Sequence, residues 1–173
     1  MQIIVTSKIE PPWMETADLL RGIKEDTSSK SNQTILKWAE LVADGVERDY
    51  TTDATPWCGL FVAFCMQDNG LEPVHQPLWA QNWNKYGDKL KEPCYGAIMV
   101  FVRNGGGHVG FYVSEDTSYY HILGGNQSDQ VNVTRVAKGR CIGYRWPENM
   151  EKFRVPGRIK REWKDGKVST NEA

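Results

Sequence analysis

Three residues of the sequence have the types and the order of a nucleophile, a base and an orienting group: Cys58, His108 and Asn126. A cysteine acts as a nucleophile in its thiolate form and needs a base that takes its proton. The members of such a set lie close in space although they are distant in sequence. The side chain of Asn126 could accept or orient the ring N–H of His108. Together the three residues indicate nucleophilic catalysis by a cysteine.

The residues around Cys58 predict a helix that begins beside it. Thr55 is suited to the N-cap position and Pro56 to the first helical position. Cys58 would then lie in the first turn, where backbone N–H groups and the positive end of the helix dipole stabilise a thiolate. The segment 60–66 is almost entirely apolar, so we expect this helix to be buried on most sides.

The residues around His108 and Asn126 predict that the two lie at the ends of neighbouring strands. His108 follows the glycine run 105–107 and begins a predicted strand over 108–113. Glycine at this place allows a substrate backbone to approach. Asn126 ends the next predicted strand, 119–123. In an antiparallel hairpin the end of one strand lies beside the start of its neighbour, so Asn126 should be near the imidazole.

The remaining pattern predicts helices in the first half of the chain and strands in the second. Apolar residues with a period of three to four predict helices, and β-branched and aromatic runs between turn residues predict strands. This order indicates an α+β fold with N-terminal helices packed on an antiparallel sheet of about five to six strands. We expect one catalytic domain over 12–150, an N-terminal arm over 1–11 and a basic C-terminal tail over 151–173. The predicted helices are 13–24, 35–42, 55–66 and 77–86, and the predicted strands are 97–103, 108–113, 119–123, 130–136 and 141–145.

Composition excludes several classes of protein. The 173 residues include 40% hydrophobic and 11% aromatic residues, enough for a core, and the net charge of -1 lacks the excess of positive charge typical of a nucleic-acid binder. No apolar run approaches the roughly 18 residues of a membrane-spanning helix. The four cysteines have no spacing typical of zinc ligands, and the acidic residues before Cys58 lack the spacing of a calcium loop. We therefore expect no metal, no other cofactor, no nucleic acid and no membrane insertion.

The motifs resemble those of the NlpC and CHAP group of peptidoglycan-cleaving cysteine hydrolases over about residues 12–147. The resemblance implies a papain-like core with Cys58 as catalytic nucleophile, His108 as base and Asn126 as the polar third residue. The implied substrate is bacterial peptidoglycan, cleaved at the muramoyl-alanine amide or within the stem peptide. Gly59 departs from the pattern, since a small residue such as alanine is commoner there. The motifs are Thr55-Pro56-Trp57-Cys58-Gly59-Leu60-Phe61-Val62, Ala80-x-x-Trp83-x-x-x-Gly87, Gly96-Ala97-Ile98-Met99-Val100-Phe101, Gly107-His108-Val109-Gly110-Phe111, Gly124-Gly125-Asn126-Gln127 and Tyr144-Arg145-x-Pro147.

The opening Pro12-Trp13-Met14-x-x-Ala17 and the Gly-Asn-Gln ending resemble a subgroup common in bacteriophages and bacteria. This resemblance implies a phage lysin. Residues 1–8 show no basic segment followed by an apolar one, so we expect synthesis in the cytoplasm without a signal peptide. That fits an endolysin released by a holin, an enzyme assembled into the virion, or an antibacterial effector with an immunity protein.

Five further residues are candidates for substrate binding. Trp57 and Trp83 could line a groove for sugar or peptide, as could Trp79 and Tyr112, and Gly107 would give the substrate backbone room. Asp53 could contact substrate amines, although the acidic residues near it also fit a solvated face. The candidates for substrate binding are Trp57, Asp53, Gly107, Gln127 and Trp83.

Other interpretations of these residues remain open. Cys58 could be a small buried apolar residue, as cysteines often are, and His121 could make a structural hydrogen bond within its strand or line the groove. The protein could be a catalytically silent module that binds the wall or forms part of a phage tail. A papain-like enzyme that acts on protein amides is the third alternative.

Overall fold

The computed structural model describes residues 9–28, 30–42, 45–163 and 167–168. Among these residues the chain forms three α-helices, four short 3-10 turns and one six-stranded sheet, with the α-helices before the strands, which confirms the predicted α+β class. The helices are α1 (Pro12–Leu19), α2 (Gln33–Leu41) and α3 (Cys58–Asp68), and the 3-10 turns are η1 (Val46–Arg48), η2 (Ala80–Lys85), η3 (Lys138–Arg140) and η4 (Glu151–Phe153). The strands are β1 (Asp88–Lys89), β2 (Ile98–Arg103), β3 (Gly106–Glu115), β4 (Tyr119–Gly124), β5 (Asn132–Ala137) and β6 (Cys141–Trp146).

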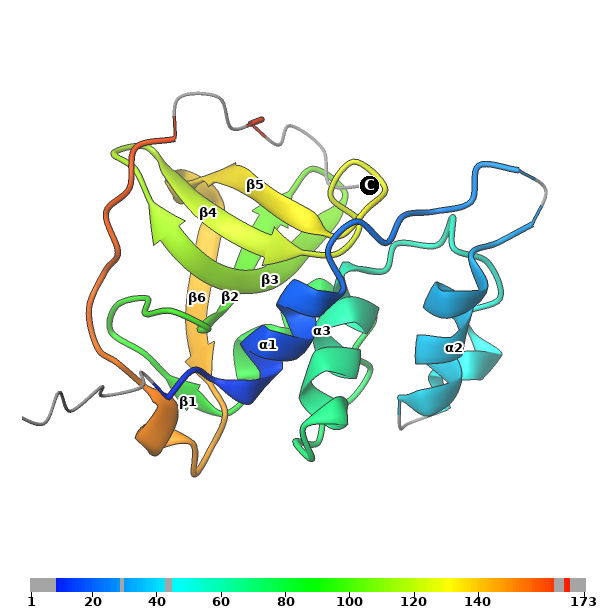
Figure 1. Ribbon diagram of the computed structural model, residues 1–173, viewed down its shortest axis with the longest axis horizontal. Helices are drawn as coiled ribbons and strands as arrows, with labels where there is room; N and C mark the ends of the chain where they lie inside the picture. Colours follow the sequence, from blue (N-terminus) through cyan, green and yellow to red (C-terminus); the bar gives the residue numbers. More distant parts are fainter. Residues whose placement is uncertain (1–8, 29, 43–44, 164–166, 169–173) are drawn as a thin grey trace, which may run out of the picture.

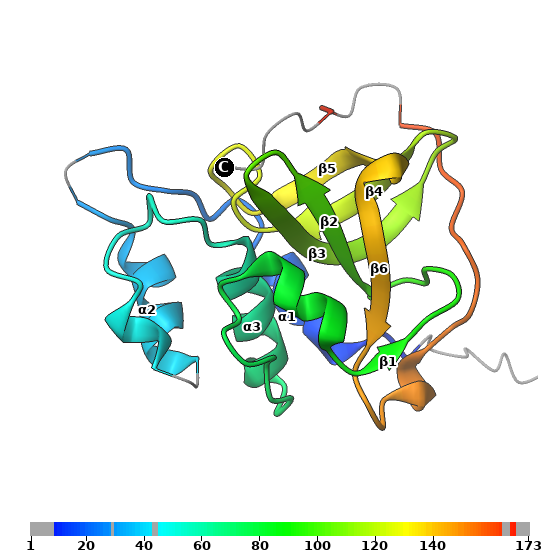
Figure 2. The same cartoon turned by 180° about the vertical axis from the view of Figure 1, so that it is seen from behind.

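The sheet has the strand order β1-β6-β2-β3-β4-β5, and every neighbouring pair is antiparallel. Helices α1 and α3 lie together below one face of the sheet, and α2 lies beyond α3, away from the sheet (Figure 1). The view from behind shows the same layers, with the η2 segment in front of α3 (Figure 2). The N-terminal half of the chain therefore covers one face of a sheet made by the C-terminal half.

The core lies between α3 and the sheet. Helix α3 is buried along most of its length, as its apolar sequence predicted, and the Phe61 ring packs edge-on against Phe111 of β3. Trp13 of α1 is fully buried, contacts the ring of Trp146 and donates a 2.9 Å hydrogen bond from its indole nitrogen to the Gly96 carbonyl. Aromatic side chains buried in this way contribute about 1.5–3 kcal/mol each to folding. Their packing fixes where α3 begins relative to the strands.

Several predicted boundaries differ from the structure. Helix α1 ends at Leu19 rather than at residue 24, and the chain soon passes through Gly22, whose φ of 88° ends helical geometry. Helix α3 begins at Cys58 with Trp57 as N-cap, so the expected cap at Thr55 is wrong. The predicted helix 77–86 consists only of the 3-10 turn η2, and the short strand β1 was not predicted.

The C-terminal segment after β6 runs along the outside of the sheet (Figure 1). The Ile159 carbonyl accepts a hydrogen bond from the Glu115 N–H, and the Arg161 N–H donates to the Glu115 carbonyl. The expected tail over 151–173 is thus joined to the end of β3. Residues 1–8 of the expected N-terminal arm, and residues 164–166 and 169–173 of the tail, lie outside the described residues.

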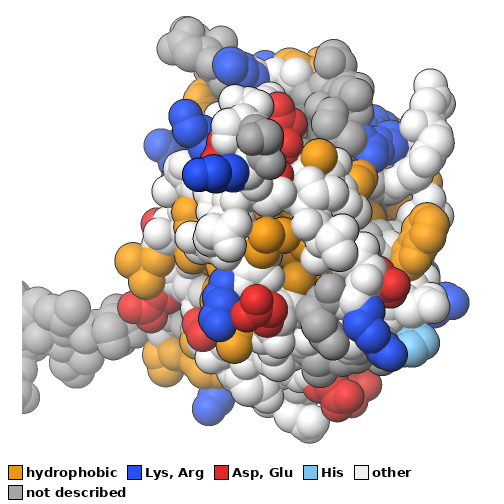
Figure 3. Space-filling model, turned by 90° about the vertical axis from the view of Figure 1, so that its right-hand side faces the viewer, with side chains coloured by type: hydrophobic (Ala, Val, Ile, Leu, Met, Phe, Trp, Pro, Cys, Tyr) orange, Lys and Arg blue, Asp and Glu red, His pale blue; other side chains and the backbone are white. Residues whose placement is uncertain are grey.

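The described surface and helices carry two further observations. On the face shown in Figure 3, acidic and basic side chains are interspersed and neither sign gathers into a patch. No described helix combines the length and the apolar character needed to span a bilayer.

Candidate active site

Cys58 is the first residue of α3, at the end of the helix where backbone N–H groups lack intrahelical acceptors. Only 4% of its surface is exposed. It lines a cavity of about 520 Å³ that is also bounded by residues before η2 and by the turn between β2 and β3. The lining residues are Val46, Asp49, Thr55, Pro56, Cys58, Gln76, Pro77, Leu78, Trp79, Ala80, Arg103, Gly105, Gly106 and Gly107.

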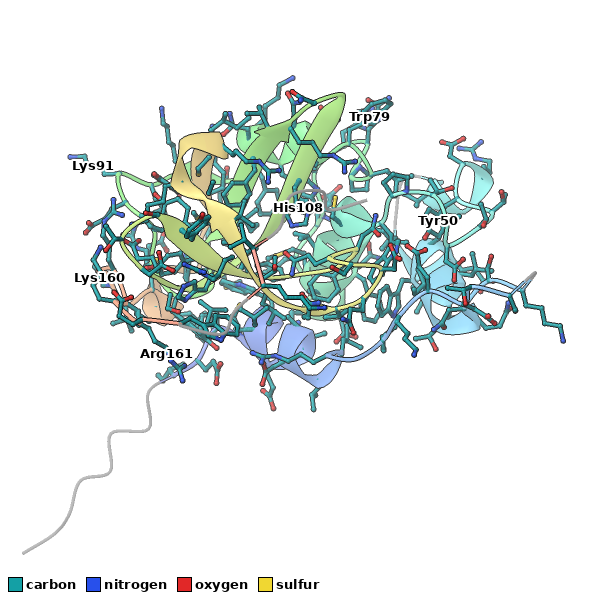
Figure 4. The ribbon with its side chains drawn as sticks, turned by 90° about the horizontal axis from the view of Figure 1, so that it is seen from above. Tyr50, Trp79, Lys91, His108, Lys160 and Arg161 are labelled. Carbon is teal, nitrogen blue, oxygen red and sulfur yellow. The ribbon has the colours of Figure 1, made fainter. Side chains whose placement is uncertain are left out.

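His108 reaches this region from β3. It is fully buried, lies opposite Phe101 in the register of β2 and β3, and follows Gly107, which lines the cavity together with Cys58. Figure 4 shows His108 inside the molecule, where the sheet meets α3. The cysteine and the residue before the histidine therefore border the same cavity.

The glycine pair before Asn126 brings the His108 ring and the start of α3 to one place. A Cβ atom on Gly124 would lie 3.4 Å from Nε2 of His108. A Cβ on Gly125 would lie 2.6 Å from the Trp57 ring, directly before Cys58, and such a contact is too short to be tolerated. Only glycine fits at Gly125, so the 124–127 turn can lie close to both the imidazole and Trp57 at the start of α3.

Gln127 holds the ring of His108. Its Oε1 atom lies 2.9 Å from Nε2 of His108. Its Nε2 amide group donates to the carbonyl oxygens of Ile122 and Asn132, at 3.1 and 2.7 Å, and to Oδ1 of Asn132 at 3.0 Å. These acceptors fix which end of the amide is the oxygen, and an oxygen facing His108 requires a proton on Nε2. In the neutral ring the basic nitrogen is then Nδ1.

The hydrogen bond expected from Asn126 is therefore made by the next residue. Asn126 is 3% exposed and has a left-handed φ of 56°, and its Oδ1 makes no hydrogen bond with the part of the chain that the structure describes. The sequence located the correct segment, but it gave no signal for the turn that aims Gln127 rather than Asn126 at the imidazole. Gln127, expected to contact substrate, instead contacts His108.

Asp53 does not face the cavity, contrary to its expected contact with substrate amines. It is 3% exposed, and its Oδ2 accepts hydrogen bonds from the backbone N–H groups of Asp26 and Asn32 at 2.8 and 2.7 Å. The carboxylate thereby ties the loop before α2 to the segment before α3. Its role in the described structure is to hold this loop.

The tryptophans differ in a way that sequence did not predict. Trp57 and Trp83 are fully buried and donate indole hydrogen bonds to Oε1 of Glu25 and to the Pro77 carbonyl, at 2.8 and 2.9 Å. Neither lines the cavity beside Cys58. Trp79 does so, with 70% of its surface exposed. Tyr112 is also fully buried, whereas Gly107 lines the cavity as expected.

The other three cysteines are poor nucleophiles. Burial raises the pKa of the Cys65 thiol well above its ordinary value, and it raises the pKa of Cys94 and of Cys141 to about 11. Thiols of this kind are protonated at neutral pH. No disulfide joins the four cysteines, which all belong to the described residues. In the described part of the chain, no group of three or more His, Cys, Asp or Glu side chains is arranged to hold a metal ion.

Comparison with known proteins supports a family for the segment that holds this site. Residues 50–126 match the family model of the CHAP domain, a range that contains Cys58 and His108 and ends at Asn126. The match supports a CHAP-type peptidoglycan hydrolase, with amidase or peptidase activity in general, and the α+β structure is consistent with a papain-like core. No curated protein and no solved structure matches the chain. Bacterial peptidoglycan is the substrate that this family implies.

Proposed function

We propose that the protein hydrolyses an amide bond of peptidoglycan with Cys58 as nucleophile and His108 as general base. The observation that carries this proposal is the fixed bond between Gln127 and Nε2 of His108, beside the cavity that Cys58 lines. It leaves Nδ1 as the nitrogen that takes and returns a proton in the neutral ring. Gln127 is the positioning residue in this scheme, and Asn126 shapes the turn that presents it.

The reaction proceeds in two halves. His108 holds the proton of Cys58, and the thiolate attacks the amide carbonyl to form a tetrahedral intermediate. The C–N bond then breaks, the nitrogen leaves as an amine with the proton from His108, and the acyl group remains on sulfur as a thioester. Water, deprotonated by His108, attacks the thioester and releases a carboxylic acid and the thiol.

The start of α3 supplies the electrostatic part of catalysis. The backbone N–H of Cys58 belongs to the first turn, where such groups have no intrahelical acceptor. It faces the position where negative charge develops on the carbonyl oxygen, and a buried donor in such a place contributes about 2.7–4 kcal/mol to lowering the barrier.

The direct test is the Cys58→Ala protein on purified sacculi. We expect a folded protein that releases no soluble fragments, because the thioester cannot form. Cys141→Ser is the matched control, since Cys141 is a partly exposed thiol that does not line the cavity, and it should lyse sacculi like the parent. Lysis by folded Cys58→Ala protein would refute the mechanism.

We propose a phage lysin as the biological setting, made in the cytoplasm and dependent on a holin to reach the wall. The support is the resemblance of the opening and Gly-Asn-Gln motifs to phage enzymes. Expression in the cytoplasm alone should leave bacteria intact, whereas co-expression with a holin should lyse them. If the protein were found assembled in a virion, or neutralised by an immunity protein, it would be a virion enzyme or an antibacterial effector rather than an endolysin. The chemistry at Cys58 would be the same.

A further inference from the structure

A second cavity adjoins the one that Cys58 lines. It measures about 330 Å³, and its wall includes Trp79, Gln81 and Asn82 but not Cys58. The two cavities share a border formed by Gln76, Trp79, Ala80, Gly106 and Gly107. One ligand can therefore extend across this border and occupy both cavities.

Trp79 stands at the border with most of its indole exposed. Among the described large apolar side chains that are exposed, it is the one aromatic residue. Figure 4 shows it projecting outward at the edge of the molecule, whereas His108 lies in the interior. Exposure of so large an apolar ring beside a cavity is typical of a binding surface.

The backbone that holds Trp79 is fixed. Its N–H donates to the Gln76 carbonyl at 3.2 Å, and its carbonyl accepts from the Asn82 N–H at 2.9 Å. The preceding Leu78 carbonyl lies against Gly59 of α3, where a Cβ atom would approach it to 3.0 Å. The helix that carries Cys58 thus sets the position of the indole. This contact also explains why glycine follows the cysteine, since a Cβ on Gly59 would lie only 2.1 Å from the Pro77 carbonyl oxygen.

The two cavities differ in charge. The one with Cys58 includes Asp49 and Arg103, which carry opposite charges. The smaller one contains no charged residue and combines the indole with three carboxamide side chains, those of Gln76, Gln81 and Asn82. A peptide stem carries ionised carboxylates and amines, whereas an N-acetylated sugar is uncharged and rich in hydroxyl and amide groups. The charged lining of the cavity with Cys58 therefore suits the peptide stem, and the uncharged lining of the smaller cavity suits the sugar.

We infer that the smaller cavity is a sugar subsite, in which the indole of Trp79 stacks on an N-acetylated pyranose of the glycan strand. The C–H groups on one face of a pyranose are positively polarised, and they match the negative face of the indole. Gln81 donates its amide group to the Gly106 carbonyl, and Asn82 donates to the carbonyls of His75 and Gln76. Their amide oxygens can accept hydrogen bonds from the hydroxyl and acetamido N–H groups of a sugar. This inference rests on the proposed function, and it selects the bond: a sugar beside Cys58 places the lactyl–L-alanine amide at the thiol, which makes the enzyme an amidase.

The test measures binding to the full-length Cys58→Ala protein, which does not consume its ligand. N-acetylmuramoyl-L-alanyl-D-isoglutamine and D-lactoyl-L-alanyl-D-isoglutamine differ in the sugar alone, and the Trp79 indole N–H signal in NMR titrations reports contact. We expect the added change Trp79→Ala to weaken binding of the sugar-containing probe roughly five- to tenfold, and Trp79→Phe to restore most of it. Binding of the peptide-only probe should not change. Leu19→Ala, at another exposed apolar residue, should affect neither probe.

Two outcomes would overturn the subsite. One is an equal loss for both probes, which would place the stem peptide on Trp79, and the other is no loss for either. Mass spectrometry of sacculi digested by the parent protein adds a check on the bond, since new amino ends other than L-alanine would refute the amidase. Lysis by the Cys58→Ala protein would instead refute the proposed mechanism while leaving the binding result intact, so the two failures are distinguishable.

Discussion

His108 and His121 are both fully buried on adjacent strands of one sheet, yet their surroundings differ. A neutral amide, that of Gln127, holds Nε2 of His108, and the residue before this histidine lines the cavity beside Cys58. His121 lies farther along the sheet, where Ser114 Oγ is 2.7 Å from its Nδ1 and Asp116 Oδ2 is 3.1 Å from its Nε2. Both nitrogens of His121 are thus held by side chains inside the protein.

Ser114, His121 and Asp116 have the residue types of a serine–histidine–aspartate triad, but their arrangement does not suit catalysis. Burial alone would raise the pKa of Asp116, but the hydrogen bonds that its carboxylate accepts, the largest of them from His121, lower the pKa well below its ordinary value. Arg135 also binds this carboxylate. Trp163 packs edge-on against the His121 ring, with ring centres 5.2 Å apart. A histidine needs access to substrate as well as suitable neighbours, and of these two histidines only His108 directly follows a residue, Gly107, that lines the cavity beside Cys58. His121 has the structural hydrogen bonds that its place within a strand indicated.

The largest expected effect separates these two histidines. His108→Ala should lower kcat/KM by about 10³-fold or more, because the proton acceptor for Cys58 is lost. His121→Ala should unfold at lower urea concentration but retain near-parent kcat/KM once folded. Dye release from labelled sacculi measures activity, and circular dichroism measures folding. Loss of catalysis in a folded His121→Ala protein would mean that the second cluster takes part in the reaction.

Glu115, beside the His121 cluster, should make stability depend on pH. Burial alone would raise its pKa, but hydrogen bonds from Lys138, Lys160 and Tyr112 and the charge of Arg158 lower the pKa to about 2. A depressed carboxyl pKa stabilises the fold above the ordinary value of 4.5, and this contribution is lost as pH falls toward 2. The unfolding free energy should therefore fall by up to about 3 kcal/mol across this window. In the Glu115→Gln protein this decrease in unfolding free energy should be smaller. Urea unfolding at each pH measures it for both proteins.

The assignment of Gln127 rather than Asn126 to the His108 ring can be tested by comparing two variants. Gln127→Leu removes the acceptor and should lower kcat about 10- to 100-fold with little change in KM, because a displaced ring misaligns proton transfer. Asn126→Gly keeps the left-handed backbone and should have a smaller effect. The NMR signal of the Nε2 proton of His108 should disappear or shift in Gln127→Leu alone. If Asn126→Gly has the larger loss of kcat, Asn126 is the orienting residue.

The sequence predicted the order of elements well because strong local patterns determined them. The apolar run of α3 and the β-branched runs of β2 to β6 allow few alternatives. It also predicted that His108 and the Gly-Asn-Gln turn would lie together, since adjacent antiparallel strands require this. Helix starts were less accurate, because the buried Trp57 occupies the N-cap position without the side-chain hydrogen bond that sequence rules look for.

What sequence could not predict depends on side-chain direction and tertiary contact. The left-handed backbone at Asn126 decides which of two adjacent amides reaches the imidazole, and the sequence Gly-Asn-Gln fits either. Likewise, tryptophan spacing does not reveal that Trp57 is sealed by Glu25 while Trp79 is exposed. Asp53 looked like a surface acid, but two backbone N–H groups from a distant loop bind it.

The smallest expected effect concerns Trp163, which packs edge-on against His121, whereas the ring beside His108 is that of Phe101 on the neighbouring strand, tilted with ring centres 6.3 Å apart. Trp163→Ala should lower the unfolding free energy by about 0.5–1.5 kcal/mol, the range for an aromatic edge contact, because the ring only adds to hydrogen bonds that remain. Lysis of sacculi should be unchanged, since Trp163 is not among the residues that line the cavity beside Cys58. Urea unfolding and dye release measure the two quantities on the same sample. A drop in lysis without a drop in stability would show that the C-terminal segment acts on the site, and the contrast between the two histidines would then have to be revised.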